Sequence, residues 1–224
     1  PTTIEDYFHC PYKAFLSHSI RLKRREEDKV DALSVGNLMH DVFKEYADRV
    51  NVVEDEESSD ALFLEVLEKV IKEEKYAKYL EDCATKATVD RVVLESKKYC
   101  YKIFASLKNS DFKVSKTEAS FGDRPTDQFK AISLNDGKIK LCGKIDRVDE
   151  SDNYYRVVDY KTGKAECTDK LLFSGLKLQL FLYAAAVEAS FGEDKKKLAG
   201  IYYLPVSDKF NAIDKKIEPM TVGK

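Results

Sequence analysis

The sequence has no long uninterrupted run of apolar side chains. A helix that spans a membrane needs roughly 18 or more consecutive apolar residues, and no segment approaches that length. The first residues also lack the basic and then apolar stretch that is typical of a secretory signal. These absences argue against a membrane protein, and we expect the chain to work in the cytoplasm.

Cysteine is scarce and widely scattered. No two cysteines form a C-x-x-C pair, and the five positions are Cys10, Cys83, Cys100, Cys142 and Cys167. Closely spaced pairs are the usual sign of a zinc site, and secreted proteins held together by disulfides have a denser pattern. We therefore expect mainly buried or half-buried free thiols.

An excess of positive charge is also missing. The formal net charge is -2, so the composition carries no global electrostatic signature of nucleic-acid binding, although a local basic groove remains compatible with it. The sequence contains no G-x-x-x-x-G-K-[ST] motif, which is the phosphate-binding loop of many ATPases. ATP hydrolysis is therefore not expected of these residues.

The apolar content is nevertheless sufficient for a folded core. Hydrophobic residues make up 43% of the 224 positions, which suits one large domain or a core with an inserted lobe. There are no internal repeats. Because the chain starts at Pro1 and stops soon after a predicted strand, we expect residues 1–224 to be a single domain cut from a longer protein.

Helical periodicity dominates the first half of the chain. Apolar residues at helical spacing predict three helices, with these core positions: Leu38, Val42, Phe43, Tyr46 and Val50; Phe63, Val66, Leu67, Val70, Ile71 and Ala77; Val89, Val92, Val93, Cys100, Ile103, Phe104 and Leu107. Ser34 is the expected N-cap of the first helix, and residues 54–60 are expected to form an acidic loop. The second and third helices predict a helical lobe over about residues 52–109. The aromatic-rich residues 3–16 are expected to dock on the core.

The pattern changes to strands after residue 111. Residues 112–121, 129–134, 138–148 and 154–161 read as strands of an antiparallel meander, with a turn signal at Asn135-Asp136-Gly137. A helix over residues 171–189 and a last strand over residues 198–204, stopped by Pro205, follow. This order predicts an α/β fold with a mixed sheet flanked by helices.

Charged residues end one of these strands in an unusual way. Asp159 and Lys161 follow the apolar pair Val157 and Val158, and alternation along a strand points the two charged side chains the same way. Since charged groups at a buried strand need partners, two interpretations remain open. One is a surface Asp–Lys pair, which is common. The other is a magnesium site, in which Asp146 on the neighbouring strand supplies a second carboxylate.

Phosphodiester hydrolysis would use such a site directly. It requires a metal to neutralise the phosphate charge and an activated water. The backbone carbonyl of Tyr160 offers a third oxygen, and Lys161 is placed to orient or help deprotonate the water.

The spacing of these residues resembles the D…(D/E)xK signature of the RecB-like nuclease superfamily. Asp146 precedes Asp159-Tyr160-Lys161, with Gly143 ahead and residues 162–163 (Thr-Gly) behind. Further motifs of that family occur in the same order: Gly36-x-x-x-His40 on the first long helix and Gln179-x-x-x-Tyr183 on the later helix. The resemblance implies a restriction-endonuclease-like fold, a metal ligand at His40 and a magnesium- or manganese-dependent nuclease.

Three more side chains have roles that the resemblance implies less specifically. Glu118 matches an acid often present in the family, as a supporting or metal-linked group, but an ordinary strand-edge glutamate is an equal alternative. Gln179 and Tyr183, one helical turn apart on one face, would hydrogen-bond substrate phosphates or Lys161. Ordinary helix packing is the alternative for both.

The first residues are similar to one branch of this superfamily, the C-terminal nuclease domain of AddB-type (RexB-type) proteins. The segment is Tyr7-Phe8-His9-Cys10-Pro11-Tyr12. In that branch the first cysteine joins three later ones around an iron–sulfur cluster, which takes four thiolates. Cys10 fits the first ligand, but the closely spaced trio is absent from these 224 residues. A cluster is therefore expected only in a longer protein, and Cys10 is a free thiol here.

The resemblance implies the nuclease domain of an ATP-dependent helicase–nuclease that processes DNA ends in recombination repair, with an AddA-like partner subunit. Two alternatives stay open. One is a DNA-binding or scaffolding module that keeps the site without cleaving. The other is a stand-alone exonuclease of Cas4-like or phage type.

Overall fold

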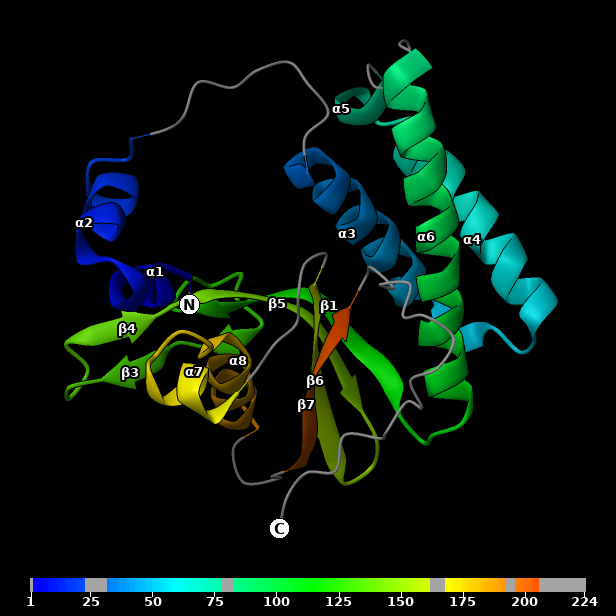
Figure 1. Cartoon of the computed structure of the whole chain (residues 1–224). Helices are drawn as coiled ribbons and strands as arrows, with labels where there is room; N and C mark the ends of the chain where they lie inside the picture. Colours follow the sequence, from blue (N-terminus) through cyan, green and yellow to red (C-terminus); the bar gives the residue numbers. More distant parts are fainter. Residues whose placement is uncertain (1, 23–31, 78–82, 162–167, 192–195, 206–224) are drawn as a thin grey trace.

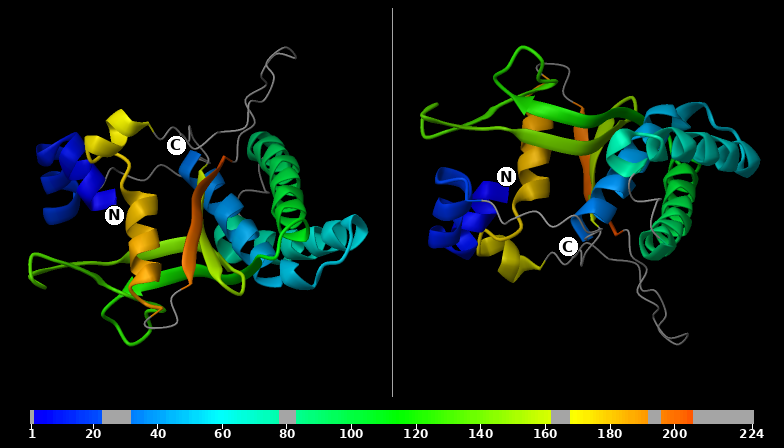
Figure 2. Two further views of the ribbon diagram at one scale, coloured as in Figure 1. Left: turned by 90° about the horizontal axis from the view of Figure 1, so that it is seen from below. Right: turned by 90° about the horizontal axis from the view of Figure 1, so that it is seen from above.

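The computed structural model describes residues 2–22, 32–77, 83–161, 168–191 and 196–205 (Figure 1). Within these ranges the chain forms a mixed α/β fold, in which one sheet has helices on both faces (Figure 2). The predicted fold class is confirmed. None of the helices in the described ranges is both long and apolar enough to cross a membrane. Thr162 and Gly163 of the sequence motif lie outside the described residues.

The central sheet has five strands in the order β2-β1-β5-β6-β7. The strands β1 (Lys113–Gly122), β5 (Gly143–Glu150) and β6 (Tyr154–Lys161) are antiparallel neighbours. The edge strands β2 (Phe129–Lys130) and β7 (Lys197–Pro205) run parallel to β1 and β6 respectively. The predicted hairpin of β5 and β6 is therefore confirmed, and Pro205 is the last residue of an edge strand.

The predicted meander is wrong between β1 and β5. Residues 129–134 and 138–148 do not form single strands, because each is divided: β3 (Ile132–Leu134) and β4 (Ile139–Leu141) make a separate two-stranded hairpin. Its turn is the predicted one, with positive φ at Asn135, Asp136 and Gly137. Since this hairpin leaves the main sheet, β1 pairs directly with β5.

One face of the sheet is covered by three long helices: α3 (Ala32–Arg49), α4 (Glu56–Ile71) and α6 (Cys83–Lys108). Their apolar sides share a core with Val114, Val158 and Tyr160 of the sheet. The helical lobe predicted over residues 52–109 contains α4, the short helix α5 (Glu74–Ala77) and α6. A 3-10 turn (Val50–Val52) follows α3.

The helix boundaries differ from three expectations. Helix α3 begins at Ala32, so Ser34 lies inside it and is not its N-cap. Residues 56–60 are not a loop, because Asp55 and Ser58 form a capping box that starts α4 at Glu56. Ala77 belongs to α5, since α4 ends at Ile71.

The opposite face of the sheet is covered by α8 (Gln179–Glu188), which packs against Ala119, Ile145 and Val157. The single helix predicted over residues 171–189 is instead two, because α7 (Asp169–Phe173) is followed by Gly175 with φ +73°. A left-handed residue ends a helix, and glycine adopts it without strain.

The N-terminal segment leaves most of its aromatic rings exposed. It forms α1 (Thr2–His9), α2 (Pro11–Ala14) and a π-helical turn (Phe15–Ser19), which lie beside α7 and the start of α8 (Figures 1 and 2). Tyr7, Phe8, Tyr12 and Phe15 each remain at least half exposed. The segment nevertheless docks beside α7 and α8, since the Phe8 ring lies against Gly175. A second contact is made by Glu5, whose carboxylate accepts hydrogen bonds from the backbone N–H groups that start α8.

Candidate metal and phosphodiester site

The site begins with two carboxylates on neighbouring strands. The register pairs Thr117 with Arg147 and Ala119 with Ile145, which places Glu118 of β1 opposite Asp146 of β5. Glu118 has φ +47°, a left-handed conformation that is uncommon for a residue with a side chain and is concentrated at functional sites. Adjacent strands therefore hold two acidic side chains next to each other, although they bear the same charge.

Helix α3 adds an imidazole to this pair. His40 Nδ1 lies 3.8 Å from Asp146 Oδ2, and one ligand atom each from His40, Glu118 and Asp146 lie within 4.8 Å of one another. The His40 ring also packs edge-on against Tyr160, with ring centroids 5.8 Å apart. These contacts make the three residues a candidate metal centre.

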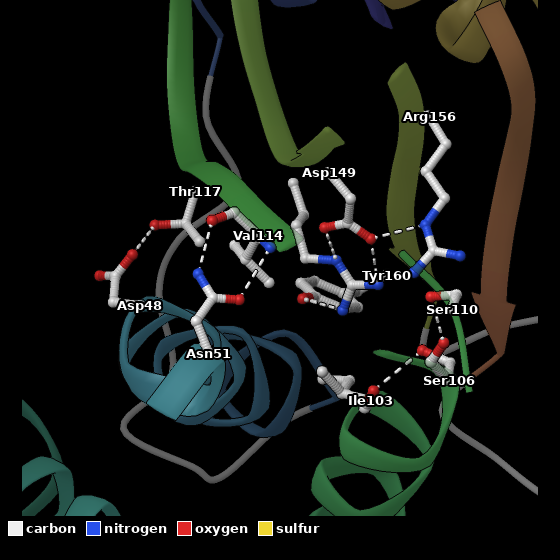
Figure 3. A network of polar contacts seen from close by, with 11 residues as sticks. Asp48, Asn51, Ile103, Ser106, Ser110, Val114, Thr117, Asp149, Arg156 and Tyr160 are labelled. Carbon is white, nitrogen blue, oxygen red and sulfur yellow. Dashed lines mark hydrogen bonds and ion pairs between the residues drawn. The ribbon is translucent and has the colours of Figure 1, made fainter. Parts of the chain in front are cut away.

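Two polar contacts attach the C-terminal end of α3 and the 3-10 turn that follows it to β1 (Figure 3). The Asn51 side-chain amide donates to the Val114 carbonyl at 2.8 Å and accepts from the Val114 N–H at 2.9 Å. Nearer to His40, the Thr117 hydroxyl donates to Asp48. Gly36, one turn before His40, is buried. The helix therefore has a defined position over β1, the strand that carries Glu118.

The Asp146 carboxylate is hydrogen-bonded to the backbone, but its surroundings destabilise its charged form. The Tyr160 N–H donates to Asp146 Oδ2 at 2.8 Å. Burial, together with the negative charge of Asp159, nevertheless raises the pKa of Asp146 to about 7. Burial and the neighbouring carboxylate thus favour the neutral form of Asp146.

A second chain of contacts runs along β6 to α8. Lys161 Nζ lies 2.7 Å from Asp159 Oδ2 and donates to Gln179 Oε1 at 2.8 Å. Gln179 Nε2 in turn donates to the Tyr183 hydroxyl at 2.7 Å. Burial raises the pKa of Asp159, although the Lys161 ammonium opposes that shift. Lys161 is the more exposed of the pair, with 28% of its side chain accessible against 1% for Asp159.

The structure thus divides the residues singled out from the sequence into two groups. His40, Asp146 and Glu118 are together, whereas Asp159 lies with Lys161, Gln179 and Tyr183. The two groups interact through the charges of Asp146 and Asp159. The Tyr160 backbone lies between them and donates its N–H to Asp146. Cys10, half-buried and free, precedes α2, away from both.

An open cleft of about 500 Å³ contains the first group. It is lined by Asn37, His40, Asp41, Lys75, Tyr76, Glu118 and Asp146. Four of these residues were not singled out from the sequence: Asn37, Asp41, Lys75 and Tyr76. Asp41 follows His40 directly, which is a weak signal. Lys75 and Tyr76 are brought in by the helical lobe, and no local pattern marks them.

An acidic residue on one strand and an Asp-x-Lys on the next, with a helical histidine nearby, define a nuclease site of the D…(D/E)xK class. The chain belongs to the PD-(D/E)XK nuclease superfamily, whose family model matches residues 1–222. The resemblance found in the sequence is therefore confirmed at the level of the family.

Curated relatives give a more specific similarity. The chain is 28% identical over 228 residues to the B-type subunit of the ATP-dependent helicase/deoxyribonuclease of Clostridium tetani, covering 96% of this chain and 20% of that protein. Proteins of the same name match at 29% identity in Thermoanaerobacter sp. (96% of this chain, 20% of that protein) and in Exiguobacterium sibiricum (89% and 19%). The chain spans about one fifth of the length of the relatives that it matches.

Proposed function

We propose that this chain is a magnesium- or manganese-dependent deoxyribonuclease that hydrolyses phosphodiester bonds, with exonuclease activity at DNA ends. The main observation behind the proposal is that His40, Glu118 and Asp146 lie close together, beside the Lys161–Asp159 pair. It joins a cluster of potential metal ligands to a cation that can contact a water or a phosphate.

The donor set fits a divalent cation. Carboxylate oxygens suit Mg²⁺ and Mn²⁺, which commonly bind through one or two carboxylates and complete their coordination with water and phosphate. The raised pKa of Asp146, caused by burial and by Asp159, indicates a site in which added positive charge stabilises the ionised carboxylates. His40, Glu118 and Asp146 would hold the ion. Asp159 and the Tyr160 carbonyl are the further ligands proposed from the sequence.

The chemistry divides between the ion and the chain. A bound divalent ion would neutralise phosphate charge and lower the pKa of a water molecule. Lys161 uses two of its three ammonium donors on Asp159 and Gln179. Its remaining N–H is free to orient the attacking water or to stabilise charge on a phosphate oxygen. Gln179, itself held by Tyr183, sets the direction of the lysine.

We further propose that the domain serves the nuclease-bearing component of a helicase–nuclease in recombination repair, with an AddA-like partner. This rests on the names of the relatives. It agrees with the absence of a phosphate-binding loop from these 224 residues, since ATP hydrolysis would then lie elsewhere in the assembly. In such a longer protein, Cys10 would be the first of four thiolate ligands of an iron–sulfur cluster.

The test is metal-dependent cleavage of end-labelled single-stranded and duplex DNA by the wild type and by Asp146→Asn, Asp159→Ala and Lys161→Ala. We expect cleavage with Mg²⁺ or Mn²⁺, none with a chelator, and a loss of at least about 100-fold in each variant, as for groups that stabilise a transition state. Asp60→Asn is the control, because Asp60 is an exposed carboxylate that pairs with Lys97 in the helical lobe. Cleavage that survives in Asp146→Asn and Asp159→Ala would refute the proposal. Metal binding without cleavage by the wild type would favour the scaffolding alternative.

A further inference from the structure

The lining of the cleft contains more carboxylates than lysines or arginines. Its described lining includes the carboxylates of Asp41, Glu118 and Asp146, whereas Lys75 is the one lysine or arginine in that lining. A phosphodiester chain brings further negative charge. A divalent ion would offset the charge near Asp146, but a neighbouring phosphate needs its own cation.

Lys75 stands on the short helix α5, at the upper end of α4 and α6 in Figure 1. Its ammonium lies 2.6 Å from Asp41 Oδ2 and 2.8 Å from Glu73 Oε2. These two ion pairs hold a flexible side chain in one place and occupy two of its three N–H donors. The ammonium also lies 4.9 Å from the centroid of the Tyr76 ring, and 54% of the side chain is accessible to a ligand in the cleft.

A purely structural role explains Lys75 less well. The Tyr76 hydroxyl also donates to Asp41 Oδ2, at 2.6 Å, from a buried side chain. Tyr76 therefore attaches α5 to α3 through a contact of its own with the Asp41 carboxylate. An exposed ion pair adds little stability to such an attachment. Binding of an anionic ligand in the cleft is therefore the better explanation for the position of Lys75.

We propose that Lys75 binds a backbone phosphate of the nucleic-acid strand in the cleft, adjacent to the phosphate that is cleaved, and that Asp41 positions it. This inference rests on the proposed nuclease function. It makes α5 the part of the helical lobe that contacts substrate. Because a phosphate contact is independent of base identity, Lys75 contributes affinity rather than sequence preference.

The chain offers a matched control. Lys69 of α4 pairs with Glu45 of α3 at 2.5 Å, one helical turn beyond Asp41 on the same helix. Both lysines bridge the helical lobe to α3 and both are more than half exposed. Lys69, unlike Lys75, is not among the described residues that line the cleft.

The experiment compares Lys75→Ala, Lys75→Arg and Lys69→Ala with the wild type, at several salt concentrations. Steady-state cleavage of a labelled single-stranded oligonucleotide gives KM and kcat, and fluorescence anisotropy of the same oligonucleotide gives binding. We expect Lys75→Ala to raise KM and Kd roughly fivefold, the effect of one exposed charge contact. It should leave kcat within about twofold, because a contact made equally in ground and transition states changes KM alone.

The salt dependence separates a phosphate contact from a structural effect. Loss of one phosphate contact on a single strand should reduce the slope of log affinity against log salt by about 0.7. Lys75→Arg should restore the slope, and Lys69→Ala should match the wild type. All variants should melt within a few degrees of it.

The outcomes are distinguishable. If the wild type cleaves but Lys75→Ala and Lys69→Ala have the same KM and salt slope, the role of Lys75 is overturned and the nuclease proposal stands. If the wild type binds DNA without cleaving and Lys75→Ala alone reduces the slope, the phosphate contact is supported and the catalytic proposal fails. A wild type that neither binds nor cleaves overturns both.

Discussion

Two aspartates of β5, three positions apart, have opposite electrostatic surroundings. Asp149 is fully buried and lies 2.9 Å from the Arg147 guanidinium and 2.7 Å from that of Arg156 (Figure 3). Asp146 faces the carboxylates of Glu118 and Asp159, and its pKa is raised to about 7 by burial and by Asp159. Asp149 is neutralised by two guanidinium groups, whereas burial and a neighbouring carboxylate disfavour the charged form of Asp146.

The exchange of each aspartate for asparagine should therefore change stability in opposite directions. The folded-state pKa of Asp146, about 7, lies above its ordinary value of 3.8. Folding thus favours the protonated form, and stability is lost as the pH rises from about 4 to 7. At pH 8 without metal, Asp146→Asn should raise the free energy of unfolding by ~2 kcal/mol, while at pH 4 the gain should largely vanish.

Asp149→Asn should instead lower the free energy of unfolding by about 3–5 kcal/mol, because it leaves buried arginines without their anion. Urea unfolding of both variants in a chelator measures the pair of effects. If Asp146→Asn proved as destabilising as Asp149→Asn, Asp146 would be part of the structural core and not a site for an added cation.

At the scale of the elements, the position of α3 decides where His40 lies. Asn51, in the 3-10 turn that follows α3, connects this turn to β1 through two hydrogen bonds to Val114. Asn51→Ala should lower the free energy of unfolding by about 1–3 kcal/mol, since two backbone groups lose their partner. It should also weaken metal binding, and excess Mn²⁺ should restore cleavage.

Asn109→Ala is the control for this substitution, because the Asn109 amide is exposed and bonds only the Ala105 carbonyl at the end of α6. Thermal melting and metal titration by calorimetry provide the two measurements. An Asn51→Ala protein whose metal affinity equals that of Asn109→Ala would show that the hydrogen bonds from Asn51 to Val114 are not needed to position His40.

The elements also explain how far the sequence predicts the site. Helical periodicity and strand alternation identify α3, α4, α6 and the β5–β6 hairpin, because each pattern is local. The identity of the strand that pairs with β5 does not follow from any local pattern. A meander would separate residues 112–121 from β5 by other strands, whereas β3 and β4 leave the sheet and let β1 pair with β5. This pairing places Glu118 beside Asp146, in the cluster with His40.

The same limit applies to the conformation of single residues. The left-handed backbone of Glu118 has no local signal in the sequence, whereas Gly175 is itself a local signal for the end of a helix. The four-residue helix that brings Lys75 to the cleft has too few positions to show a period. The spacing of Asp146, Asp159 and Lys161 locates the site, but the residues that complete it come from elements whose placement is not encoded nearby.

At the scale of the whole molecule, the first helix is connected to the start of α8, the helix that carries Gln179. Glu5 Oε1 accepts hydrogen bonds from the N–H groups of Leu178 and Gln179, at 2.7 and 3.0 Å. No side chain of α8 itself caps this end, so Glu5 supplies an anion where the helix dipole favours one. The helix that Glu5 caps carries Gln179, which binds Lys161. The N-terminal segment thus supports the site across more than 170 residues of sequence.

Glu5→Ala should therefore reduce both stability and rate. Loss of the cap should lower the free energy of unfolding by ~1 kcal/mol, and a less ordered Gln179 should lower kcat several-fold through Lys161, with KM little changed. Glu5→Gln keeps an acceptor oxygen without the charge, so most of the rate should return. Melting curves and steady-state kinetics on one oligonucleotide, with Glu57→Ala in the first turn of α4 as the exposed control, separate these effects. If Glu5→Ala lost stability but kept the wild-type kcat, α1 would serve only to anchor the end of the chain, and the geometry of Lys161 would be set entirely within β6 and α8.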